Sequence, residues 1–163
     1  MAAIPAELDF PDVDKPYVES ICGRLEPKVS PKRRHAILQV RIAIALAQWA
    51  GERGEVGTEW RCYLLAGARP SSLVPDVSYY SFERLPASLP DDARERPRIA
   101  PDVAVEILSP GDSRRLLDEK IALYFAHGGL TVIVADPLAR TIALHGADPA
   151  GLALDRDELF AGL

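Results

Sequence analysis

The chain has 163 residues, which is enough for one domain with a substantial core and too few for two comfortable ones. Apolar residues make up 48% and charged residues 26%, close to the average of globular proteins, so the composition excludes wholesale disorder. The net charge of −5 argues against the tight electrostatic binding of nucleic acid that a basic face provides.

The beginning of the chain differs in character from the rest. Residues 1–15 carry prolines among scattered acids and predict a flexible arm, whereas residues 16–163 predict a single domain. A secretory signal has a basic region followed by an apolar run, and the start of this sequence lacks that pattern. The longest apolar stretch, residues 37–50, is interrupted and too short to span a bilayer. Cys22 and Cys62 lack metal-ligand spacing and are typical of reduced structural thiols, so we expect a cytoplasmic protein without membrane association.

Residues 31–51 predict the first helix. Ile37, Val40 and Ile44 fall near helical spacing, so we expect them to face the core, with Arg41 on the opposite side. Basic residues precede and open this helix. Such a cluster is usually an ordinary solvated face, and the functional alternative is that it holds phosphates near an acidic centre. The cluster consists of Lys28, Lys32, Arg33, Arg34 and His35.

The middle of the chain predicts two strands and a long loop. Apolar residues alternate over 60–64, which is the period of a half-buried strand. Residues 73–80 predict a second strand, which carries the dipeptide Pro75-Asp76. Residues 84–98 hold three prolines and many charges and therefore predict an exposed loop.

The second half of the chain has the clearest pattern. Residues 99–108 are almost continuously apolar except for two acids, which predicts a central strand covered on both faces. A turn at 109–112 precedes a helix over about 114–127, and two β-rich runs at 131–135 and 140–145 predict a hairpin. The order of helix, strands, helix and hairpin indicates an α/β fold with a mixed sheet flanked by helices.

The two acids of the central strand, Asp102 and Glu106, need an explanation, because a buried carboxylate is costly unless it is paired or bound to a metal. They point to the same face of a regular strand but lie about 13 Å apart at roughly 3.3 Å per residue, too far to share one ion. Another group must therefore join at least one of them. The candidates are Asp76 on a strand that would lie alongside and Lys120 on the following helix.

Lys120 shares one helical face with Leu116 and Tyr124, which indicates that this face packs on the sheet. A buried lysine needs an anion, and the acidic strand before it is the natural source. A purely structural ion pair between Glu106 and Lys120, with Asp102 capping a turn, explains these residue types about equally well.

The pattern of residues in the second half resembles a known family. It consists of Pro101-Asp102, Glu106-Ile107-Leu108-Ser109-Pro110, Asp118-Glu119-Lys120, Tyr124, Gly128 and Asp136-Pro137. This combination resembles the Uma-two family of endonucleases in the PD-(D/E)xK, or restriction-endonuclease-like, superfamily. The resemblance is densest over residues 98–145 and extends more weakly back to Glu19.

The resemblance implies a restriction-endonuclease-like mixed-sheet core, Mg²⁺ or Mn²⁺ as cofactor, and hydrolysis of DNA phosphodiester bonds. It implies that Asp76, Glu106 and the Ile107 carbonyl are metal ligands. It further implies that Asp102 is another acid of the catalytic site and that Lys120 is the lysine of the signature.

This sequence departs from the superfamily at one position. The usual lysine stands two residues after the strand acid, where this chain has Leu108. Lys120 can replace it only if the following helix folds back onto the strand. Glu19, Arg34 and His35 are candidate helper or phosphate-contacting residues. The alternatives are that Glu19 is an exposed structural residue and that His35 is merely solvated.

A metal-dependent DNA endonuclease is the leading hypothesis, and a homodimer would let two sites reach two strands. The first alternative is a catalytically inactive relative that binds nucleic acid or a protein partner, which the acidic net charge and Leu108 favour. An enzyme acting on a smaller phosphorylated substrate and a purely structural ion-pair network are the remaining alternatives.

Overall fold

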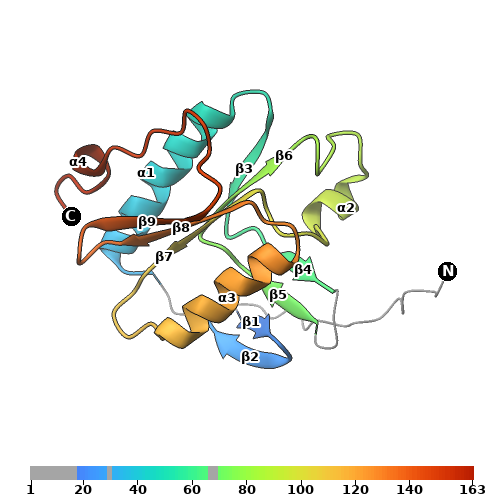
Figure 1. Ribbon diagram of the computed structural model, residues 1–163, viewed down its shortest axis with the longest axis horizontal. Helices are drawn as coiled ribbons and strands as arrows, with labels where there is room; N and C mark the ends of the chain where they lie inside the picture. Colours follow the sequence, from blue (N-terminus) through green and yellow to red (C-terminus); the bar gives the residue numbers. More distant parts are fainter. Residues whose placement is uncertain (1–17, 29–30, 66–69) are drawn as a thin grey trace.

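The computed structural model describes residues 18–28, 31–65 and 70–163, so the predicted flexible arm lies outside the described part of the chain. The described residues form two sheets, two long helices and two short ones (Figure 1). Helices α1 (Arg33–Ala50) and α3 (Arg114–Ala126) lie on opposite faces of the larger sheet, as Figure 1 shows. The predicted α/β fold with a mixed sheet flanked by helices is confirmed.

The larger sheet has five strands in the order β3-β6-β7-β8-β9. They are β3 (Gly54–Thr58), β6 (Val77–Ser81), β7 (Val103–Ile107), β8 (Thr131–Asp136) and β9 (Thr141–Gly146). Strand β7 pairs antiparallel with β6 and parallel with β8, and every residue of β7 is buried. The predicted central strand and the predicted hairpin of β8 and β9 are therefore both present.

The smaller sheet has four antiparallel strands in the order β2-β1-β5-β4. They are β1 (Val18–Ile21), β2 (Arg24–Pro27), β4 (Cys62–Leu64) and β5 (Ser71–Leu73). Together with α3 this sheet covers one face of the larger sheet, because Ile21 and Leu64 join Leu117 and Tyr124 in one hydrophobic cluster. Strands β1 and β2 are not predicted from the sequence, since four-residue strands with so few apolar residues leave no clear alternation.

The expected orientation of α1 is wrong. Val40 and Ile44 are 57% and 52% exposed, whereas Leu38 and Ile42 are fully buried against the larger sheet. The helix is apolar on more than one face, so its spacing fits two orientations. Only the contact with the larger sheet, at β3, β6 and β7, selects between them.

The predicted strand over residues 73–80 is two strands in different sheets. Strand β5 ends at Leu73, and β6 begins at Val77. Pro75 lies between them, and a proline cannot donate a hydrogen bond to a continuous ladder. The crossing from one sheet to the other brings Asp76 to the junction of the two sheets, which positions it for the site described below.

Other local expectations have mixed outcomes. The predicted loop over 84–98 contains the short helix α2 (Asp91–Glu95), and α4 (Arg156–Leu159) near the C-terminus is not predicted. Helix α3 begins as expected, with Ser113 Oγ accepting a hydrogen bond from the Leu116 amide. Among the described residues, no helix combines the length and apolar composition needed to cross a bilayer.

The two cysteines are free, as expected. Cys62 is buried in the cluster beneath α3, and burial raises the pKa of its thiol to about 12. A thiol in this environment stays protonated and unreactive at neutral pH.

Candidate active site

A small cavity of about 100 Å³ lies where β7 ends, β6 begins and α3 folds back against the sheets. The cavity is open to solvent on one side and is large enough to hold water. Seven ionisable side chains line this cavity, of which Asp112 is exposed. We call the other six the polar cluster. They are Glu19, Lys28, His35, Asp76, Glu106 and Lys120.

Glu106 is positioned by the alternation of β7. Val105 and Ile107 face α1, so Glu106 points to the opposite side, toward α3. Lys120 Nζ lies 2.6 Å from Glu106 Oε2, and the Tyr124 hydroxyl donates to Glu106 Oε1 at 2.6 Å. Lys120 and Tyr124 are four residues apart on α3, so one helical face supplies both partners. The helix therefore folds back as the replacement of the usual lysine requires.

Glu19 on β1 brings the smaller sheet into the site. It is 5% exposed, so its alternative interpretation as an exposed structural residue is wrong. Its Oε1 accepts a hydrogen bond from the Val74 amide at 2.7 Å, and its Oε2 lies 3.1 Å from Lys120 Nζ. Lys120 is thus held between two carboxylates that come from different sheets.

Asp76 lies just before β6 and is fixed from several sides. Its amide donates to the Val105 carbonyl at 2.9 Å, and its Oδ2 accepts from the Ile107 amide at 2.6 Å. His35 Nε2 lies 3.3 Å from Oδ2, so the histidine is buried in the site and is not merely solvated. Lys28 Nζ lies 2.8 Å from Oδ1 as an ion pair without the direction of a hydrogen bond.

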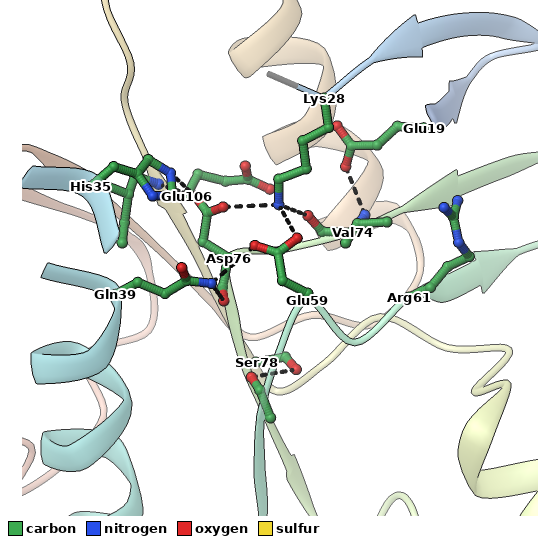
Figure 2. Close-up of polar contacts among 12 residues, drawn as sticks. Glu19, Lys28, His35, Gln39, Glu59, Arg61, Val74, Asp76, Ser78 and Glu106 are labelled. Atoms are coloured by element: carbon green, nitrogen blue, oxygen red, sulfur yellow. Dashed lines mark hydrogen bonds and ion pairs between the residues drawn. The ribbon is translucent and has the colours of Figure 1, made fainter. Parts of the chain in front are cut away.

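Three members of this environment are not predicted as site residues. Lys28 belongs to the basic cluster seen in the sequence, but only the structure places its ammonium beside Asp76 and Glu59 (Figure 2). Glu59 has no sequence signal, because it lies in the segment between β3 and β4. Tyr124 is recognisable as a residue of the inward face of α3, and the hydrogen bond to Glu106 gives it a further role.

Two predicted site residues do not join the polar cluster. Asp102 precedes β7 at the other end of the strand, where it accepts hydrogen bonds from the Ser81 amide at 2.8 Å and the Ser81 hydroxyl at 3.1 Å. Arg84 Nη1 lies 3.4 Å from it. Arg34 is exposed in the first turn of α1 and lines a neighbouring groove rather than the cavity.

The ionisation of the polar cluster follows from burial and from charge pairing. Burial raises the pKa of Glu106 to about 7, although Lys120 acts in the opposite direction. Burial alone would lower the pKa of Lys120, but Glu106 and Glu19 outweigh it and raise the pKa above its usual value. Burial would raise the pKa of Asp76, but His35 and Lys28 outweigh it and hold the pKa well below its usual value. The site thus contains an ionised aspartate and a charged lysine at neutral pH.

The donor atoms suit a hard divalent cation. In the part of the chain that the structure describes, no three His, Cys, Asp or Glu side chains converge as a complete metal site. The carboxylate-bearing residues Asp76 and Glu106 nevertheless line the same cavity as Ile107. Mg²⁺ prefers oxygen ligands and keeps several waters, so it needs only such a partial set. Asp76 Oδ1 is buried and accepts no oriented hydrogen bond, which leaves a lone pair for a cation.

Comparisons with known proteins agree with this architecture. No curated protein matches the chain. The crystal structure of a "putative nuclease belonging to DUF820" from Anabaena variabilis superimposes with a TM-score of 0.78 at 23% sequence identity, covering 91% of this chain and 92% of that one. The fold is therefore shared with that protein. The model of the Uma2 family, described as "Putative restriction endonuclease", matches residues 6–158. Because this match spans nearly the whole sequence, the chain belongs to the Uma2 family.

Proposed function

We propose that the protein hydrolyses phosphodiester bonds of DNA with the help of a divalent metal ion, Mg²⁺ or Mn²⁺. The observation that supports this most directly is the meeting of Asp76, Glu106 and Lys120 around one cavity. These residues come from three different elements, yet Lys120 reaches to within 2.6 Å of Glu106. The description of the Uma2 family as "Putative restriction endonuclease" also supports a nucleic acid as the substrate.

In this proposal the metal ion is held by the carboxylates of Asp76 and Glu106 and by the carbonyl of Ile107. When bound, the ion supplies a Lewis acid for the attacked phosphate and lowers the pKa of a bound water. Asp76 is ready for this role because its pKa is held low, so that it is ionised at neutral pH.

Lys120 would stabilise the negative charge that develops on the attacked phosphate. Its pKa is raised, so its ammonium keeps its charge inside the protein. Glu19 and Tyr124 are positioning residues in this scheme. Glu19 holds the ammonium at 3.1 Å, and Tyr124 fixes the free oxygen of Glu106 at 2.6 Å.

The charges at and beside the cavity indicate how DNA would approach. The cavity is small and lined by charged side chains, so we expect it to receive a phosphate group while the rest of the strand lies along the surface. Helix α1 begins beside the cavity, and its start carries the exposed basic residues Lys32, Arg33 and Arg34 without an acid in the first turn. This local charge supports contact with phosphates despite the net charge of −5.

The test is cleavage of supercoiled plasmid by the purified protein with Mg²⁺, Mn²⁺ or EDTA. We expect nicking that needs a metal ion and that falls at least about a hundredfold in Glu106→Gln. Asp102→Asn is the matched control, since Asp102 and Glu106 are both 6% exposed and lie at opposite ends of β7. Equal loss of cleavage in the two variants, or cleavage that persists in EDTA, would contradict the proposed site.

One observation favours the alternative of a catalytically inactive relative. Lys120 pairs with two carboxylates and Lys28 with two more, so each of these carboxylates has an ammonium partner without a metal ion. A folded protein that neither nicks plasmid nor gains thermal stability with Mn²⁺ would support this alternative.

The homodimer and the cytoplasmic location remain predictions. Sedimentation with and without DNA tests the homodimer.

A further inference from the structure

Lys28 occupies a position that has the form of a cation site. Its ammonium lies 2.7 Å from the Val74 carbonyl, 2.8 Å from Asp76 Oδ1 and 3.0 Å from Glu59 Oε2 (Figure 2). We call these three oxygen atoms the oxygen cage. The side chain of Lys28 is only 15% exposed, so solvent contributes little to its solvation.

The oxygen cage is fixed by groups other than Lys28. Gln39 Nε2 donates to Glu59 Oε1 at 3.0 Å, which leaves Oε2 of the same carboxylate to face the ammonium. The same amide donates to the Asp76 carbonyl at 2.8 Å and so ties Glu59 to the start of β6. The Ile107 amide and His35 hold Asp76 Oδ2 and leave Oδ1 turned toward the oxygen cage. These oxygens would therefore keep their arrangement if the ammonium left.

Two carboxylate oxygens and one carbonyl oxygen are the hard donors that Mg²⁺ and Mn²⁺ take. We propose that the oxygen cage is a divalent-cation position of the site, that Glu59 and the Val74 carbonyl are ligands beside Asp76, and that Lys28 holds this position until a metal ion displaces it. The inference rests on the proposed function, because Asp76 belongs to both ligand sets.

Charge explains why a divalent ion can replace the lysine. Asp76, Glu59 and Glu106 all lie near enough to act on the Lys28 ammonium, and they outweigh burial and raise its pKa. The single charge of Lys28 does not balance its two partners, Asp76 and Glu59, whereas a divalent ion brings one more positive charge. Lys28 follows directly after β2, which ends at Pro27, so its long side chain alone can swing out while the strand stays paired. Metal binding in the native protein is then weakened by the competing ammonium.

The experiment is calorimetric titration of Mn²⁺ into the wild-type chain, Lys28→Met and the matched control Lys32→Met, whose lysine is exposed before α1. We expect Lys28→Met to bind Mn²⁺ at least tenfold more tightly and Lys32→Met to bind like the wild type. Adding Glu59→Gln to Lys28→Met should remove this gain. In EDTA, Lys28→Met should melt at a lower temperature than the wild type. Addition of Mn²⁺ should remove this difference in melting temperature. Lys28→Gln keeps a polar group in the cage and provides the same comparison if Lys28→Met does not fold.

The outcomes separate this inference from the function on which it rests. Mn²⁺ binding that is unchanged or weaker in both Lys28 variants overturns the inference. If Glu106→Gln abolishes binding in the same titration, the proposed metal site of Asp76 and Glu106 still stands. Absence of Mn²⁺ binding in the wild type and in every variant overturns both. A tenfold gain that depends on Glu59 supports the oxygen cage.

Discussion

Lys120 is tolerated in the interior because two carboxylates surround it. It is 7% exposed and lies 2.6 Å from Glu106 and 3.1 Å from Glu19. Removing one partner of a buried ion pair typically costs about 3–5 kcal/mol, because the other charge is left uncompensated. A loss of activity in a Lys120 variant therefore mixes chemistry with stability. Removing only the hydroxyl of Tyr124 perturbs the same group more gently.

We predict that Tyr124→Phe lowers metal-dependent cleavage by about 10–100-fold, the usual effect of removing a group that orients a metal ligand. The hydroxyl donates to Glu106 Oε1 at 2.6 Å, and without it this oxygen is free to rotate away. Tyr80→Phe is the control, because Tyr80 is equally buried and its hydroxyl donates to the Ile99 carbonyl away from the cavity. Each variant should lose about 1–2 kcal/mol in urea unfolding. Cleavage rates that fall equally in both would assign Tyr124 to packing alone.

At the scale of elements, those with a clear local sequence pattern are predicted, and those that depend on contacts with distant residues are not. Strand β7, helix α3 and the β8–β9 hairpin are predicted because a continuous apolar run, a turn before a helical segment and two adjacent β-rich runs mark them locally. Strands β1 and β2 escape prediction, because their short sequences gain stability only by pairing with each other and with β5. The inward face of α1 is not predicted for a related reason. Apolar residues lie on several faces of this helix, so packing on the sheet decides which face is buried.

The two faces of α1 can be compared with one residue type. Ile42 is fully buried against the larger sheet, and Ile44 is 52% exposed on the same helix. Ile42→Ala should cost about 2–5 kcal/mol of unfolding free energy, because it removes packed methyl groups and leaves a cavity. Ile44→Ala should change stability by no more than about 0.5 kcal/mol. Urea titrations followed by circular dichroism measure both. Similar losses would mean that the exposed face is covered in solution.

At the scale of the whole molecule, the site exists only because the two sheets meet. Glu106 and Lys120 are predictable from one stretch of sequence, since a strand and the helix that follows it supply both. Glu19 is a candidate only through the family resemblance, and Lys28 and Glu59 are not predicted, because their positions in the site depend on the smaller sheet and the segments beside it. Asp102, in contrast, is predicted as a site residue but lies outside the polar cluster. It shares a face with Glu106 along β7, but the length of the strand carries it to Ser81 and Arg84 at the far end.

Because the net charge is −5, DNA contact requires a surface where positively charged side chains are concentrated. Arg34 is exposed at the start of α1, beside the cavity, whereas Arg114 is exposed at the start of α3 and pairs with Asp118. Arg34→Glu and Arg114→Glu change the total charge by the same amount, so they separate local contact from overall repulsion. We predict that Arg34→Glu weakens binding of labelled duplex DNA in EDTA and lowers the salt dependence by about one released ion, while Arg114→Glu has little effect. Fluorescence anisotropy over a range of salt concentrations measures both quantities. Equal weakening by the two substitutions would show that DNA senses only the total charge and does not lie along the start of α1.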